Sequence, residues 1–197
     1  MIEPLDGVTR YALFTSDGKR FVWGSPDSGI AVEEDSIAVM RAGRWTHAAF
    51  ADIVSVTLNT AMIGRSSVAQ CIVVLGNGNK IVTSNANANG FVDGSRNRDF
   101  EDFVVALHRQ LVASGAAKSI AFHSGYSSGR MNMLMLALIA GVALFLVLPL
   151  GLLLVTGDIK ALGIIVAGCF LLWPAWQVAN ANKPSSYSPE RPPNLFA

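Results

Sequence analysis

Four side chains near residue 45 have the types and the spacing that can bind an anionic group. They flank the predicted turn of a β-hairpin and are Arg41, Arg44, Trp45 and His47. Guanidinium groups form charge-assisted hydrogen bonds with carboxylates and phosphates, and an indole ring adds an area for stacking. The sequence therefore predicts a binding surface for an acidic protein segment or an anionic lipid headgroup. The alternative is a solvated strand edge, because the acidic run of residues 33–35 balances the arginines.

The sequence contains no motif of an enzyme or of a cofactor-binding protein. Its histidines, His47, His108 and His123, form neither an i, i+4 pair nor an HExxH motif, so no metal site is predicted. No G-x-S-x-G, Walker A or dinucleotide-binding glycine motif occurs. Cys71 and Cys169 lie in separate apolar segments, which predicts two buried, unpaired thiols. We expect neither catalysis nor a cofactor.

The composition indicates a membrane protein without affinity for nucleic acid. Of the 197 residues, 51% are hydrophobic and 15% are charged, whereas an ordinary soluble domain has about 25% charged residues. Through Arg130 the chain has 12 basic and 12 acidic residues. A neutral domain lacks the positive field that attracts nucleic acid, so we expect no nucleic-acid partner.

Two apolar segments predict a hairpin of antiparallel transmembrane helices over residues 131–180. The first, residues 131–155, is long enough to cross the roughly 30 Å hydrocarbon core of a bilayer. The second, residues 161–178, follows after a short turn. Neither segment has a charged residue in its interior, which favours an anchor over a transporter. Small residues at i, i+4 spacing, such as Ala137 and Gly141, predict packing within the hairpin or, alternatively, an oligomer interface.

Basic residues near the ends of the two spans predict the orientation of the hairpin. They are Lys118, Arg130, Lys183 and Arg191, whereas the predicted turn has Lys160 beside Asp158. Lysine and arginine remain on the cytoplasmic side, so both termini are expected in the cytoplasm of a bacterial inner (plasma) membrane. The first ten residues have neither the basic nor the apolar region of a secretory signal.

Residues 1–117 are expected to form a mainly β domain that a C-terminal helix caps. Short β-type runs separated by turn residues extend from Arg10 to about residue 86. An amphipathic helix follows, with one apolar stripe formed by Phe100, Phe103, Val104, Leu107 and Leu111. His108 is expected at the edge of this stripe. Residues 118–130 are predicted to be a flexible linker, and the Asn-rich segment 85–97 is predicted to be a mobile loop.

The order of about seven short strands and one amphipathic helix resembles the bacterial pleckstrin-homology-like (PH-like) domains that are joined to membrane spans. The resemblance rests on residues 37–56, where a hairpin leads into the next strand, and on Phe100–Leu111 in the place of the closing helix. It implies a PH-like barrel, and it implies binding and scaffolding in place of catalysis.

The proline-rich tail, residues 181–197, favours an extended conformation without a core. We expect it to be disordered, and the alternative is a docking peptide for the aromatic groove of a partner. Together these features predict a membrane-anchored, non-enzymatic binding or scaffold module. The alternative function is an accessory subunit that stabilises a larger inner-membrane complex through its hairpin. The sequence leaves the ligand and the oligomeric state open.

Overall fold

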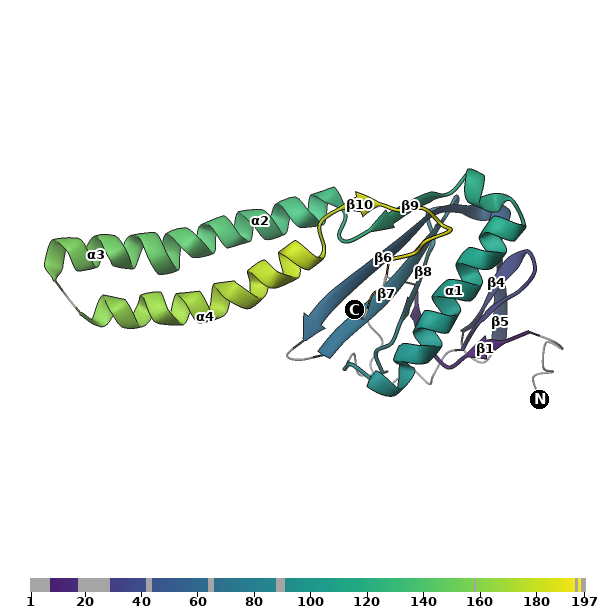
Figure 1. Cartoon of the computed structure of the whole chain (residues 1–197), viewed down its shortest axis with the longest axis horizontal. Coiled ribbons are helices and arrows are strands. Elements are labelled where there is room, and N and C mark those ends of the chain that lie inside the picture. The colour runs from purple at the N-terminus through teal and green to yellow at the C-terminus, as the bar shows by residue number, and fades with distance from the viewer. Residues whose placement is uncertain are drawn as a thin grey trace. The chain divides into compact units, whose positions relative to one another are not determined.

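The computed structural model describes residues 8–17, 29–41, 44–63, 66–87, 91–157, 159–193 and 195. The chain divides into two compact units. Unit 1 comprises Met1–Ser124 together with Ser185–Ala197, and unit 2 is Gly125–Pro184. Unit 2 is thus inserted in the sequence of unit 1, and the tail belongs to the β-rich unit (Figure 1).

Unit 1 contains two β-sheets, of strand order β1-β3-β4-β5 and β10-β9-β6-β7-β8-β2 (Figure 1). The strands are β1 (Arg10–Tyr11), β2 (Phe14–Ser16), β3 (Ile30–Val32), β4 (Ser36–Arg41), β5 (Arg44–Ala49), β6 (Ile53–Ile63), β7 (Ser66–Leu75), β8 (Lys80–Ser84), β9 (Ala121–Ser124) and β10 (Ser185–Ser186). Because β1 and β2 follow each other closely, one short segment contributes to both sheets. Among the described strands no ladder joins the sheets, so the predicted closed barrel is not shown.

Strand β4 lies in the interior of unit 1, because Ser36, Ile37, Ala38 and Val39 are all buried and both faces of the strand are covered. Ile37 and Val39 of β4 are buried, and they pair with Ala48 and Thr46 of β5. The predicted turn between these strands, residues 42–43, lies outside the described residues. The expected β7–β8 hairpin is present: the backbone N–H of Leu75 donates to the carbonyl of Asn79 at 2.9 Å.

Helix α1 (Asn97–Ala113) closes the core of unit 1. All five residues of the predicted apolar stripe are buried, which confirms the periodicity. The helix ends at Ala113, and Gly115 beyond it has a φ of 77°, which glycine adopts without steric cost. Short 3₁₀ turns η1 (Phe50–Asp52), η2 (Gly94–Arg96) and η3 (Ala116–Lys118) connect neighbouring elements.

Residues 118–130 correct the sequence analysis, because ordered structure lies in place of the predicted flexible linker. The end of η3 and strand β9 occupy this segment, and β9 pairs with β6 in parallel, Val56 opposite Phe122. Ile120 and Phe122 are buried in the core of unit 1. The small and polar residues around Ile120 and Phe122 are typical of a linker. Burial of these two apolar side chains nevertheless stabilises an ordered conformation of the segment.

The tail also differs from the predicted disordered segment. Its residues Ser185 and Ser186 form β10, which pairs antiparallel with β9, Ser185 opposite Ser124. Farther along, Tyr187 and Leu195 pack against the core. The tail is therefore ordered by contacts with residues of unit 1 that are distant from it in the sequence.

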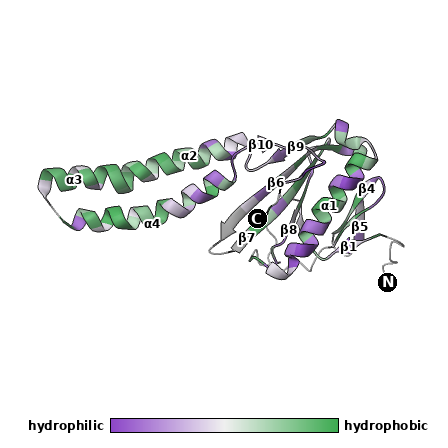
Figure 2. Ribbon diagram, viewed as in Figure 1, coloured by the Kyte–Doolittle hydropathy of each residue, from purple (hydrophilic) through white to green (hydrophobic). Residues whose placement is uncertain are grey.

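Unit 2 is built from two long helices. One consists of α2 (Ser128–Val142), the π-helical turn η4 (Ala143–Val147) and α3 (Leu148–Thr156), and the other is α4 (Lys160–Ala181). Both are long and apolar enough to cross a membrane, and Figure 2 shows apolar residues along most of their length. The π-turn lies directly before Pro149, whose missing N–H and bulky ring disturb the α-helical pattern of hydrogen bonds.

Glycines allow the two helices of unit 2 to approach each other. A Cβ atom on Gly141 would lie 2.7 Å from Leu172, and one on Gly168 would lie 2.5 Å from Cβ of Phe145. A Cβ on Gly163 would have no such neighbour within 4 Å. Packing within the hairpin, one of the two predicted roles of the small residues, is thus observed at Gly141. Gly168 packs in the same way, although the sequence analysis did not single it out.

The two ends of unit 2 are joined to each other. The backbone N–H of Tyr126 donates to the carbonyl oxygen of Asn182 at 2.9 Å. A Cβ atom on Gly125, which has a φ of 80°, would lie 2.4 Å from the carbonyl oxygen of Lys183. This close approach of two backbones requires glycine.

Candidate functional site

The predicted surface of Arg41, Arg44, Trp45 and His47 is located on the β4–β5 hairpin. Arg41 pairs with Arg44, and Met40 pairs with Trp45. The side chain of Arg41 lies outside the described residues. Successive side chains of a strand point to opposite faces, so Trp45 and His47 share one face of β5 and the exposed Arg44 belongs to the other. The four residues are close in the chain but do not all face the same way.

Trp45 contacts an arginine that the sequence analysis did not include in this surface. The guanidinium carbon of Arg10 lies 5.3 Å from the centroid of the indole ring, a cation–π distance. The ring reaches across to β3, because a Cβ atom on Gly29 would be 3.4 Å from its Cη2 atom. The indole N–H is buried, and no described residue accepts a hydrogen bond from it.

His47 is paired with an acidic residue. Its Nδ1 atom lies 2.9 Å from Oε2 of Glu33, which also accepts a hydrogen bond from the hydroxyl of Ser36. Burial acts to raise the pKa of Glu33, but the hydrogen bonds from Ser36 and His47 outweigh it and hold the pKa below its ordinary value. Glu33 is therefore ionised at neutral pH, and it balances any positive charge on His47.

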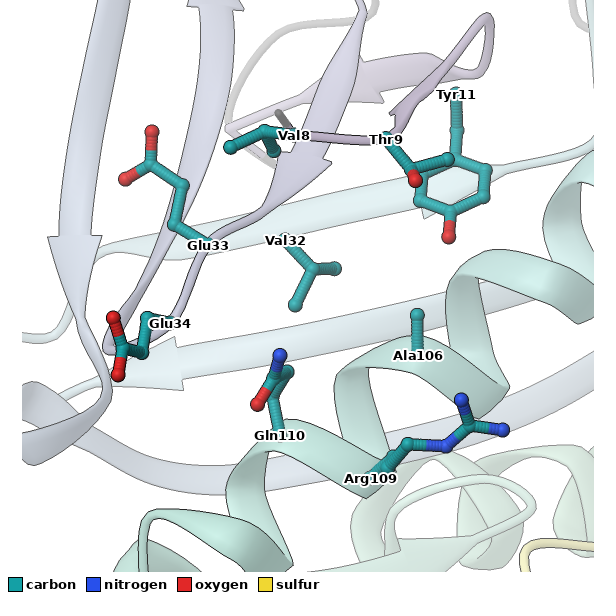
Figure 3. Close-up of a pocket in the computed structure, with 9 residues that line it drawn as sticks. All are labelled: Val8, Thr9, Tyr11, Val32, Glu33, Glu34, Ala106, Arg109 and Gln110. Carbon is teal, nitrogen blue, oxygen red and sulfur yellow. The ribbon is translucent and has the colours of Figure 1, made fainter. Parts of the chain in front are cut away.

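A pocket of about 530 Å³ lies between the β1–β3 edge and α1 (Figure 3). Its lining residues are Val8, Thr9, Tyr11, Val32, Glu33, Glu34, Ala106, Arg109 and Gln110. Carboxylates come from the β3 side, and Arg109 and Gln110 provide donors from the helix. In Figure 3 the hydroxyl of Tyr11 points towards α1, and the carboxylate of Glu33 points away from Arg109. Burial, and after it the charge of Asp102, raises the pKa of Tyr11, which therefore stays protonated.

A second polar cluster is centred on His108, which is 2% exposed. Its Nδ1 atom lies 2.7 Å from the carbonyl oxygen of Val104, and its Nε2 atom lies 2.8 Å from the hydroxyl of Tyr187. A carbonyl can only accept, so Nδ1 bears the proton and Nε2 accepts from Tyr187. Burial lowers the pKa of His108, although the bond to Val104 acts in the opposite direction. The predicted structural role of His108 at the edge of the stripe agrees with this geometry.

The two cysteines differ in burial. Cys71 is buried, and burial raises the pKa of its thiol to about 12, so it is not a nucleophile at neutral pH. Cys169, which was expected to be buried, is exposed on α4. Within the described part of the chain, no group of three or more His, Cys, Asp or Glu side chains is arranged to hold a metal ion.

The Asn-rich segment is more ordered than the predicted mobile loop. The side chain of Asn85, 0% exposed, accepts from the backbone N–H of Ala69 at 2.8 Å and donates to Asn97 at 2.7 Å. Ala86 and Val92 form a β-bridge, and residues 88–90 between them lie outside the described residues. Asn85 thus extends the pairing of β7 and joins it to the start of α1.

Comparison with known proteins identifies no relative. No protein-family model matches the chain, and no curated protein matches its sequence significantly. No match supports the resemblance to PH-like domains, which stays a prediction.

Two contacts at the candidate sites were missed by the sequence analysis. Arg10 reaches Trp45 because β1 and β5 belong to one sheet, and Tyr187 reaches His108 across 79 positions of the sequence. The tyrosine within a proline-rich tail is the one local signal for the second contact, since aromatic residues anchor extended segments in grooves.

Proposed function

We propose that this protein is a membrane-anchored, non-enzymatic module that binds or scaffolds partners through a cytoplasmic PH-like domain. The observation that supports it is the pairing of Ser124 with Ser185, the residues that flank unit 2. The chain leaves unit 1 from β9 and re-enters it at the adjacent strand β10. A hairpin inserted in this way crosses a bilayer twice and returns to the same side, as an anchor for a folded domain requires.

The arrangement of unit 1 supports the PH-like assignment within this proposal. The segment of β1 and β2 contributes to both sheets, and α1 packs on the resulting core. Strands β3–β5 complete the four-stranded sheet, and β6–β8 belong to the six-stranded sheet, to which β9 and β10 add an edge. The strands up to β8 and the helix α1 are the parts that the resemblance implies. Binding in this proposal takes place at the β4–β5 hairpin, through Arg41, Arg44, Trp45 and His47 on its two faces, and Arg10 adds a cation beside the indole ring.

The proposed orientation places both termini in the cytoplasm and the turn after Gly157 outside it. This orientation rests on the basic residues that precede the first helix and follow the second. Reporter fusions after Gly129 and after Ala197 should both report the cytoplasm, and a fusion after Gly157 should report the opposite side. Periplasmic signal from either of the first two fusions contradicts the proposed topology.

Crosslinking in intact cells tests the binding surface. The double variant Arg41→Glu, Arg44→Glu should lose its crosslinks to protein or lipid and keep the melting temperature of the parent chain. Arg98→Glu is a matched control, because that side chain is 90% exposed on α1 and lies outside the hairpin. If the crosslinked molecule is a protein, the anionic group comes from an acidic protein segment. If it is a lipid, the anionic group is a lipid headgroup. Unchanged crosslinks in the double variant exclude this surface.

The second candidate function, an accessory subunit of a larger complex, is favoured by an apolar groove on unit 2. The groove has a volume of about 520 Å³ and is lined by Met135, Leu138, Ile139, Val142, Leu146, Cys169, Leu172, Trp173 and Trp176. A helix of another membrane protein fits such a surface. Copurification of a stoichiometric partner in mild detergent supports this function, and a monomer or homo-oligomer favours the anchored module.

A further inference from the structure

The part of the proline-rich tail that belongs to unit 1 is extended at β10 (Ser185–Ser186) and turns at residues 188–191, where the N–H of Arg191 donates to the carbonyl of Ser188. Its apolar residues are partly buried, and they are Tyr187, Pro189, Pro192, Pro193 and Leu195. The intervening Ser188, Glu190 and Arg191 are exposed. The apolar side chains of the tail are thus more buried than its polar ones, as in a peptide that binds a groove through its apolar side chains.

Tyr187 is the anchor of the tail. Its ring contacts those of His108 and Phe122, with centroid separations of 5.6 and 5.7 Å. Its hydroxyl donates to Nε2 of His108, and its backbone N–H donates to the carbonyl of Phe122 at 3.3 Å. The buried imidazole accepts one hydrogen bond at this position, so the contact selects a residue with both a ring and a hydroxyl group.

Beyond Tyr187 the tail is less closely packed. A turn brings the N–H of Arg191 to the carbonyl of Ser188 at 3.0 Å, with Pro189 in the second position that proline favours. Between the tail and α1 remain two open pockets of about 570 and 340 Å³. Val105 and Val112, which line the larger pocket, keep 47% and 40% exposure.

We infer that this surface is a peptide-binding groove for tyrosine-anchored, proline-rich segments, and that the tail is its occupant in cis. The tail groove is formed by Val105, His108, Arg109 and Val112 of α1 and by Phe122 of β9. The inference rests on the proposed function of a binding module and names a class of partner for it. Proline-rich segments lose little conformational entropy on binding, so a loosely packed groove still holds them.

The linkage of the tail to the same chain determines how a partner competes. A tethered segment has an effective concentration in the millimolar range for short linkers, so a free peptide displaces it only when the cis contact is weakened or the peptide is abundant. A partner that carries a similar segment thus exchanges with the tail. Since the inference concerns α1 and β9, it is independent of the surface on the β4–β5 hairpin.

The test uses the full chain in detergent micelles and a fluorescent peptide of residues 183–197. Fluorescence anisotropy should show that the peptide binds Tyr187→Ala, in which the cis anchor is absent, at least about 10-fold more tightly than the parent chain. A peptide with phenylalanine in place of the tyrosine should bind about 5-fold more weakly, the loss of one hydrogen bond. Adding Val105→Glu to the receptor, a change at an exposed position of the groove, should abolish binding.

A second arm does not depend on the stability of the Tyr187→Ala variant. The photo-crosslinking residue p-benzoylphenylalanine at position 105 of the otherwise unchanged chain should crosslink to the tail, and millimolar peptide should divert the crosslink to the peptide. Crosslinks that stay with the tail at all peptide concentrations overturn the inference, as does equal binding of a peptide with alanine in place of the tyrosine. Membrane fractionation and the reporter fusions measure membrane association and topology, which do not depend on peptide binding. Failure of the groove is therefore distinguished from failure of the anchor.

Discussion

The hydroxyl of Tyr187 lies 2.8 Å from Nε2 of His108 and joins the C-terminal tail to the helix that closes the β-rich unit. Between these two residues the chain forms all of unit 2. The contact therefore links the parts of the sequence that precede and follow the hairpin, and Phe122 completes it with an aromatic ring from β9. Unit 1 therefore requires residues from both sides of the hairpin, Met1–Ser124 and Ser185–Ala197.

Loss of the Tyr187 hydroxyl should destabilise unit 1. In Tyr187→Phe the ring contacts remain, but Nε2 of His108 loses its donor in a site from which water is largely excluded. The expected cost is about 1 kcal/mol, the usual contribution of one hydrogen bond. Thermal denaturation of the full chain in detergent measures it. Ser186→Ala, at the exposed preceding position, is the control and should melt like the parent chain.

The stability of unit 1 should decrease as the pH falls below the ordinary histidine pKa of 6.5. Burial lowers the pKa of folded His108, so in this range the unfolded chain binds a proton that the folded chain does not. Stability attributable to His108 is thus present above pH 6.5 and is lost as the pH falls through the lowered value. Melting temperatures between about pH 7.5 and 5.5 should decline less steeply in His108→Gln than in the parent chain.

This window separates His108 from the carboxylates. Hydrogen bonds lower the pKa of Glu33 and Asp93 below their ordinary values of 4.5 and 3.8, so their contributions are lost at more acidic pH. His47 and His123 are present in both chains and cancel in the comparison. If the melting temperatures of the parent chain and of His108→Gln decline equally with falling pH, His108 is not the group responsible for the loss of stability.

Two glycines of α4 should respond differently to the same substitution. Gly168→Ala places a Cβ atom against Phe145, and overpacking of this kind costs about 1–3 kcal/mol. Gly163→Ala has open space around the new methyl group and should have little effect. Heating in detergent, followed by gel mobility as a measure of hairpin compactness, distinguishes the variants. Equal loss in both indicates that the hairpin packs through another face.

Features with a local repeat were predictable from the sequence. The stripe that begins at Phe100 has the 3.6-residue period of a helix, and all of its members are buried on α1. Alternation in β4 is not reflected in its burial, since Ala38 is as buried as Ile37 and Val39. The spans are identified by length and hydropathy alone. In each case the residues that determine the element are neighbours in the chain, so no knowledge of the partner surface is needed.

The tail and β9 were not predictable because their partners are distant. Strand β9 has four residues and pairs in parallel with β6, and β10 has two residues that are both serine. Segments this short and polar have no periodic signal, and their order depends on burial of Phe122 and Tyr187 against α1. The candidate surface was located by residue type, but its contact between Arg10 and Trp45 depends on the order of strands in the sheet.

Removal of the hairpin should leave a soluble and complete unit 1. Ser124 and Ser185 are opposite each other in antiparallel strands, so an Asn-Gly turn that replaces residues 125–184 joins them with hairpin geometry. This chain keeps β9, β10 and the tail. It should be soluble without detergent and unfold cooperatively on heating, because its apolar core is retained and both apolar helices are absent.

The fragment 1–117, which the sequence analysis delimits as an independent domain, is the matched comparison for the excised chain. It lacks Ile120, Phe122, Tyr187 and Leu195, all of which belong to the core or pack against it. Exposing this part of the core should cost several kcal/mol at about 25 cal/mol per Å² of apolar surface, so the fragment should aggregate or melt at a much lower temperature than the excised chain. If instead both melt alike, β9 and the tail make no contribution to the fold, and the tail groove has no structural basis.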